Sequence, residues 1–212
     1  MAAATTSTIL LTQFKVDAIV LTGVAGGLAE KATVGDVVVA DQLVQHDMDA
    51  SPLFARYEVP LYGLSHFPTH PRLSDMLKRA ASSSSVTLSF QLLEEHGVKH
   101  ESLCVHQGLI LSGDQFISSS PDSLALQQAF PNALAVEMEG AAVAQACKDF
   151  KMPFAVLRII SDRANDSAHI DFNRFIVEVA SHYTVAVITT FLQLLVESAG
   201  LETVIHQRDD LP

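Results

Sequence analysis

Short apolar runs alternate with longer amphipathic stretches along most of the chain. The runs lie at residues 17–21, 37–40, 109–111, 134–136 and 154–160, and they are rich in branched side chains. Near-continuous runs of this length are typical of strands that are covered on both faces. We therefore predict strands at these positions, each ending at a group of small or polar residues.

The stretches between the runs place apolar residues three and four positions apart, which predicts helices. The helices are expected at residues 73–81, 88–96, 139–150 and 172–195. Strands that alternate with helices indicate an α/β fold. The serine run at 82–85 and the polar stretch at 68–71 are predicted to be surface loops.

Composition restricts the function classes. The chain has 212 residues and a formal net charge of −11, which argues against binding to nucleic acid or to an anionic membrane. No apolar run reaches the roughly 18 residues of a membrane-spanning helix, and the N-terminus lacks the basic start of a secretory signal. We expect one domain over residues 1–200 and a polar tail at 201–212.

The cysteines and histidines show no ligand spacing. Cys104 and Cys147 lie far apart in apolar surroundings, and the nine histidines are scattered. Neither a disulfide framework nor a zinc motif is indicated, so we expect a reducing, cytoplasmic setting and neither metal nor cofactor.

Polar residues gather after the carboxyl ends of the predicted strands, where open α/β sheets bind ligands. The groups are residues 23–27, 112–116, 137–139 and 161–162. The glycine-rich group at 23–27 is predicted to be a loop. It either lets the backbone approach a ligand closely or forms a turn without one.

Two pairs of residues could carry chemistry. Glu137 and Glu139 are either acids at a helix N-terminus or carboxylates that accept hydrogen bonds from a diol such as ribose. Ser161 and Asp162 are either an N-cap and a first-turn acid, or part of an acid site. In the second case burial raises the pKa of Asp162 above about 3.9, so that it donates a proton at neutral pH.

The Ser-Gly-Asp-Gln-Phe-Ile string at 112–117 contains one flat aromatic side chain, that of Phe116. Phe116 either fills the core or stacks on a heterocycle, while the backbone of Ile117 pairs with the ring edge. Backbone pairing needs no particular side chain, so the spacing leaves both interpretations open.

Five strings in this order resemble the 5′-methylthioadenosine/S-adenosylhomocysteine nucleosidases of the nucleoside phosphorylase superfamily. They lie at residues 22–27, 34–38, 112–117, 135–142 and 159–162 and include Val-Glu-Met-Glu and Ser-Asp. The resemblance covers roughly residues 10–197. It implies a three-layer α/β/α sandwich around a mixed sheet and hydrolysis of the bond between adenine and a 5′-thio-substituted ribose, releasing adenine.

The resemblance also assigns chemical roles to residues. Asp162 matches the general acid that protonates the purine at N7, and Ser161 matches the residue that orients it. Glu139 matches the acid that binds the ribose hydroxyls. Met138 matches a side chain that lines the ribose face, and we count Glu137 with the same site.

Further residues match the walls of the family's pocket. Phe116 and Ile117 match the adenine site, and Ala25 and Gly26 match the backbone beside the ribose and the attacking water. Phe172 matches a side chain that closes the pocket. Phe54 and Pro60 lie in a segment that, in this family, reaches into the pocket of a partner subunit, so the resemblance implies a homodimer.

The chain departs from the family pattern at its start. The family opens with a strand ending in Gly-Ala-Met-x-x-Glu, whose Glu activates the attacking water, whereas no acidic residue precedes Asp17. We therefore expect the fold to lack the first strands and to have an open sheet edge or a missing central strand.

Two alternatives to the nucleosidase follow from the same strings. One is a non-catalytic nucleoside-binding or storage paralogue, since the water-activating Glu has no counterpart. The other is a purine nucleoside phosphorylase, which needs cationic phosphate ligands, and residues 23–27 contain neither Arg nor Lys.

Overall fold

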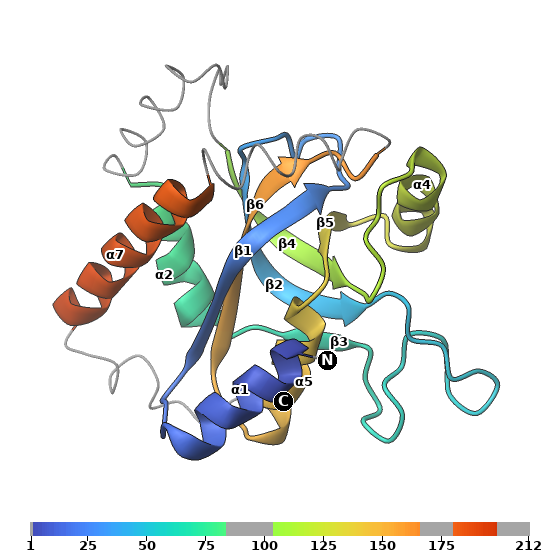
Figure 1. Ribbon diagram of the computed structural model, residues 1–212, viewed down its shortest axis with the longest axis horizontal. Helices are drawn as coiled ribbons and strands as arrows, with labels where there is room; N and C mark the ends of the chain where they lie inside the picture. Colours follow the sequence, from blue (N-terminus) through green and yellow to red (C-terminus); the bar gives the residue numbers. More distant parts are fainter. Residues whose placement is uncertain (1, 84–103, 166–179, 199–212) are drawn as a thin grey trace.

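The strands form one mixed sheet. The computed structural model describes residues 2–83, 104–165 and 180–198. Within them the sheet has six strands in the order β3-β2-β4-β5-β1-β6 (Figure 1). Their bounds are β1 Ile19–Gly27, β2 Val37–Gln45, β3 His66–Pro68, β4 Val105–Ser112, β5 Ala133–Glu137 and β6 Phe154–Asp162.

The sheet curls back on itself. β1 is parallel to β6, and β2 and β5 are both parallel to β4, whereas β3 is antiparallel to β2. β6 also pairs antiparallel with β2, with Val37 opposite Ile159. All nine residues of β6 are buried, as its near-continuous apolar sequence predicts.

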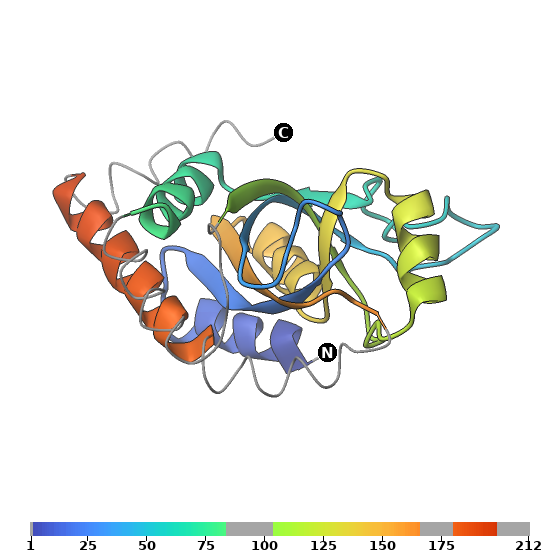
Figure 2. The ribbon, with the colours of Figure 1, turned by 90° about the horizontal axis from the view of Figure 1, so that it is seen from above.

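Helices cover both faces of the sheet. Those in the described part of the chain are α1 Ala2–Gln13, α2 Pro71–Ala81, α4 Ser120–Ala129, α5 Gly140–Asp149 and α7 Ser181–Glu197, and α4 lies beside the sheet. α2 and α7 pack together on one face and α1 and α5 on the other (Figures 1 and 2). The predicted three-layer α/β/α architecture is confirmed. Among the described residues, no helix is long and apolar enough to cross a bilayer.

The core beneath α7 follows the predicted stripe. Tyr183, Val187, Phe191 and Leu195 recur every fourth residue and are buried against β2, β6 and α2. The buried Tyr183 hydroxyl donates a hydrogen bond to the carbonyl of Ala81 at 3.3 Å. The helix predicted at 88–96, the first part of the one predicted at 172–195 and the tail at 201–212 lie outside the described residues.

The stretch at 68–71 connects β3 to α2, but the surface loop predicted there is wrong for its two central residues, which are buried. Pro68 ends β3, and Thr69 and His70 are buried. The Thr69 hydroxyl donates to the carbonyl of Ala40 at 2.9 Å, and His70 caps α2 by accepting the N–H of Leu73 at 3.4 Å. The polar side chains are therefore used inside the structure, as helix cap and strand anchor.

β1 has a strand neighbour on one side along most of its length. It pairs with β6 from Ile19 to Gly26 but with β5 only at Gly26 and Gly27. Within the described residues, positions 19–25 therefore have no second strand beside them. This one-sided pairing agrees with the open sheet edge expected from the sequence.

Candidate active site

The glycine-rich residues 23–27 form part of strand β1 and do not form the predicted loop. Their pairing with β6 outweighs the low strand propensity of glycine. A side chain at Gly23 would collide with the guanidinium of Arg158. A Cβ on Gly26 would lie 2.9 Å from the Oδ1 of Asp162. The glycines thus let charged side chains of β6 lie directly against β1.

Ser161 and Asp162 end strand β6, so the N-cap interpretation is wrong. Ser161 is 0% exposed and Asp162 is 2% exposed. The Ser161 hydroxyl donates to Oδ2 of Asp162 at 2.8 Å, and the N–H of Ala164 donates to Oδ1 at 2.8 Å. The carboxyl group is therefore buried and held in one orientation.

The two glutamates have different surroundings. Glu137 ends β5, is buried, and accepts the backbone N–H groups of Glu139 at 3.1 Å and of Gly140 at 2.9 Å, as well as the Ser112 hydroxyl. It therefore caps α5, so the helix-terminus interpretation applies to this residue. Glu139 occupies the N-cap position of α5, and its half-exposed side chain makes no cap hydrogen bond.

Arg158 links these carboxylates and was missed as a site residue. Its side chain is 4% exposed, and Nη2 donates to Oε2 of Glu137 and, at 3.1 Å, to Oε2 of Glu139. Its Nε is buried without a hydrogen-bond partner among the described residues. A single Arg inside an otherwise apolar strand could have indicated a buried carboxylate partner, because arginine is rarely fully buried unpaired.

One cavity of about 280 Å³ joins these elements. Nine residues proposed from the sequence line it: Ala25, Gly26, Phe116, Ile117, Glu137, Met138, Glu139, Ser161 and Asp162. The structure adds Gly23, Val24, Gln115, Val136 and Arg158. Groups from the ends of β1, β5 and β6 and from the segment after β4 therefore face one space.

Phe116, the aromatic residue that lines the cavity, is partly exposed to solvent. Phe116 is 42% exposed and Met138 is 39% exposed, whereas Ile117 is buried. The alternative that Phe116 fills the core is therefore wrong. A half-exposed ring on a cavity wall is available to stack on a flat ligand.

Two of the proposed residues lie away from this lining. Phe54 and Pro60 belong to the segment between β2 and β3 and do not line the cavity in the described part of the chain. Their neighbours Leu53 and Leu61 are 85% and 91% exposed. Phe172 lies outside the described residues.

Comparison with known proteins defines the class. A family profile described as "Phosphorylase superfamily" matches residues 1–193. A 5′-methylthioadenosine/S-adenosylhomocysteine nucleosidase of Staphylococcus aureus (strain bovine RF122 / ET3-1) is 39% identical over 178 residues, covering 84% of this chain and 71% of that protein. The chain belongs to the phosphorylase superfamily and, within it, to the family of these nucleosidases.

Solved structures agree with this assignment. The nucleosidase of Neisseria meningitidis in complex with methylthio-immucillin-A has a TM-score of 0.77 and 33% identity, covering 91% of this chain and 76% of that one. A futalosine hydrolase of Helicobacter pylori strain 26695 has a TM-score of 0.76 and 32% identity, covering 91% and 75%. Two hydrolases with different names thus share this fold.

Proposed function

We propose that this chain hydrolyses the N-glycosidic bond of 5′-methylthioadenosine and S-adenosylhomocysteine, releasing adenine and the thio-substituted ribose. The relatives named for this activity support the reaction. The observation that carries it is the shared cavity of Asp162 and Glu139, with Phe116 on its wall. A purine base needs the proton donor and the flat wall, and a ribose needs the carboxylate that accepts its hydroxyls.

In this proposal Asp162 is the general acid. Adenine leaves poorly as an anion, so a proton delivered to N7 lowers the barrier to cleavage. The hydroxyl of Ser161, 2.8 Å from Oδ2, and the N–H of Ala164, 2.8 Å from Oδ1, fix the direction of the carboxyl group. Such fixed geometry supports proton transfer to a purine that lies against Phe116.

Glu139 is proposed to bind the ribose hydroxyls, and Arg158 to position it. The ribosyl group gains oxocarbenium character as the bond breaks, and a carboxylate nearby stabilises that charge. Nη2 of Arg158 lies 3.1 Å from Oε2 of Glu139, which leaves Oε1 available for a hydroxyl. Arg158 also neutralises the buried Glu137.

Hydrolysis is favoured over phosphorolysis by the charge of the cavity. Arg158 is the sole cationic side chain that lines it within the described residues, and two glutamates already pair with it. A phosphate ion would meet three acidic side chains and no unpaired cation, which opposes its binding. We expect cleavage rates that do not change when inorganic phosphate is added.

We further propose a homodimer in which the segment holding Phe54 and Pro60 reaches a partner subunit. The highly exposed Leu53 and Leu61 beside them support this, because large apolar side chains gain from burial at an interface. The two free cysteines, Cys104 and Cys147, fit the expected cytoplasmic setting.

Adenine release measured by chromatography tests the reaction. Purified protein is incubated with methylthioadenosine or adenosylhomocysteine, and we expect adenine from both. Asp162→Asn keeps the shape but removes the acid, so we expect a loss of at least about 10²-fold in rate. Asp75→Asn, on the exposed face of α2, is the matched control and should leave the rate unchanged.

Two results would count against these assignments. An Asp162→Asn variant that cleaves like the parent removes the acid role. Absence of adenine release at high protein concentration, with analogue binding retained, favours the non-catalytic binding protein. Glu139→Gln should weaken binding of a ribose-containing analogue, and unchanged affinity would remove the role of Glu139.

A further inference from the structure

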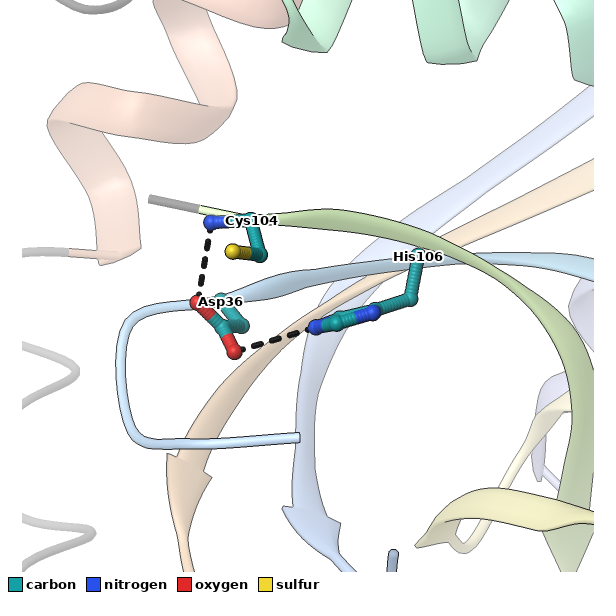
Figure 3. A group of neighbouring side chains, drawn as sticks. All are labelled: Asp36, Cys104 and His106. Carbon is teal, nitrogen blue, oxygen red and sulfur yellow. Dashed lines mark hydrogen bonds and ion pairs between the residues drawn. The ribbon is translucent and has the colours of Figure 1, made fainter. Parts of the chain in front are cut away.

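A second group of reactive side chains lies where β2 and β4 begin. Val37 and Val38 of β2 pair in parallel register with Val105 and His106 of β4. Cys104 directly precedes β4 and is two residues from His106, so in extended backbone their side chains point to the same side. Asp36 immediately precedes the paired residue of β2, so the register brings it beside Cys104 (Figure 3).

Hydrogen bonds hold the carboxylate of this group in place. Oδ1 of Asp36 accepts the backbone N–H of Cys104 at 3.0 Å, and Oδ2 accepts from Nε2 of His106 at 3.1 Å. The backbone N–H and the hydroxyl of Thr33 reach Oδ2 at 2.9 and 3.0 Å. Asp36 is buried, His106 is half-buried and Cys104 is exposed, which gives an ion access from solvent.

We propose that Asp36, Cys104 and His106 form a binding site for a zinc-type divalent transition-metal ion, with water as a fourth ligand. One sulfur, one imidazole nitrogen and one carboxylate oxygen are a donor set that Zn²⁺ accepts in tetrahedral geometry. The possible ligand atoms of the three side chains all lie within 4.8 Å of one another.

The distances suit an ion with little movement. Nitrogen and oxygen ligands about 2.0–2.1 Å from Zn²⁺ are separated by about 3.3–3.4 Å in tetrahedral geometry. The Nε2 to Oδ2 distance of 3.1 Å is about 0.2 Å shorter than this separation, so the two side chains need to part only slightly. The sulfur must approach to about 3.5 Å from both atoms, which a rotation of the exposed Cys104 side chain can provide.

Metal binding changes which atoms of the three side chains carry protons. The Cys104 thiol releases its proton to solvent and coordinates as thiolate. His106 coordinates through Nε2 with its proton on Nδ1, so the ion replaces the hydrogen atom between Nε2 and Oδ2. The donors from Thr33 and from the backbone of Cys104 remain on the carboxylate and orient it as a ligand.

Sequence spacing could not predict this site. Asp36 is 68 residues from Cys104 and 70 from His106, so strand pairing alone brings the three together. Two backbone hydrogen bonds join the site to β6 close to the proposed acid. The N–H of Gly35 donates to the carbonyl of Ile160 at 2.8 Å, and the N–H of Ile160 donates to the carbonyl of Asp36 at 2.8 Å. An ion here would stabilise the turn next to Ser161.

Cobalt spectroscopy tests the proposal without any nucleoside. Co²⁺ is titrated into untagged, reduced, chelator-treated protein. We expect a sulfur-to-cobalt charge-transfer band in the near ultraviolet and intense visible bands of tetrahedral Co²⁺, saturating at one equivalent and displaced by Zn²⁺. At about 100 times its dissociation constant, Zn²⁺ should raise the melting temperature by about 5–10 °C.

Variants separate this site from other binding. Cys104→Ser should abolish the charge-transfer band, whereas Cys147→Ala, which removes the other thiol, should leave it unchanged. His106→Gln should weaken Co²⁺ binding at least about tenfold. Circular dichroism without metal establishes that each variant is folded.

A second measurement follows the thiol directly. Zn²⁺ should slow alkylation of Cys104 in the parent, and a chelator should restore the rate. The proposal is overturned if folded parent protein gives no charge-transfer band up to about 1 mM Co²⁺, well above the affinities of structural sites. It is equally overturned if the band survives in the Cys104→Ser variant.

Discussion

Replacing Arg158 by methionine removes a buried charge and little else. Methionine is unbranched and similar in length, so it can fill much of the same space. Glu137 would remain buried, with a side chain that is 2% exposed, and would lose its cation. The side chain of Glu139 is 49% exposed and can be hydrated instead. The free-energy cost should therefore arise at Glu137.

The size of this cost follows from the contacts that Glu137 keeps. Removing one partner of a buried ion pair typically destabilises a protein by about 3–5 kcal/mol. Glu137 still accepts the backbone N–H groups of Glu139 and Gly140 and the Ser112 hydroxyl. We therefore expect the lower limit, a loss of about 3 kcal/mol, or about 6–12 °C in melting temperature for a chain of this size.

A double variant separates lost charge compensation from lost packing. In Arg158→Met with Glu137→Gln both members are neutral, so the penalty for an unpaired buried carboxylate disappears. We expect the double variant to be more stable than Arg158→Met alone, with strong non-additivity in the cycle. The exposed Arg79→Met, on α2, is the control and should change stability by less than about 0.5 kcal/mol.

Urea denaturation followed by circular dichroism gives the free energies of unfolding. Unchanged m-values across the series would show that the denatured states are comparable. The reasoning is refuted if Arg158→Met costs less than about 1 kcal/mol. It is also refuted if the double variant loses the sum of the two single losses, because the ion pair would then have no coupling energy.

Three further predictions follow. Gly23→Ala should displace Arg158, because its Cβ would collide with the guanidinium, and should lower both the melting temperature and the cleavage rate; a variant indistinguishable from the parent contradicts this. Burial lowers the pKa values of His46 and His70 below 6.5, so the unfolded state binds more protons in acid. Urea midpoints should therefore fall as pH drops below about 6.5, and flat midpoints would exclude this cause. Phe116→Ala should weaken binding of an adenine nucleoside about tenfold by calorimetry, with stability nearly unchanged because the ring is 42% exposed.

The sequence predicts helices and strands correctly where the local apolar pattern agrees with the tertiary pairing. β6 and the described part of α7 follow their apolar patterns. β3 has three residues, too few for any periodicity, and is defined by pairing with β2. α4 was also missed, since Ser123 is its one buried residue, although Ser119 caps it and accepts the N–H of Asp122. That cap was the available signal.

The candidate site also contains residues that could be predicted from the sequence and contacts that could not. Asp162 ends one apolar strand and Glu139 lies two residues after the end of another, and general rules place such residues near ligands. The partners of Arg158 lie 19 and 21 residues away along the chain, and their contact depends on how β5 and β6 are arranged in the sheet. Contacts that depend on register over such distances cannot be read from local spacing.

The convergence of the cavity residues has a topological cause. β1 and β5 are antiparallel, which ordinarily places their carboxyl ends at opposite edges of a sheet. Here they pair only at their last residues, Gly26 with Val136 and Gly27 with Ala135, so the two ends meet. Because β6 is parallel to β1, with Gly26 opposite Asp162, its end arrives at the same point. A longer overlap of β1 with β5 would carry Asp162 away from the start of α5, so the cavity depends on this short pairing.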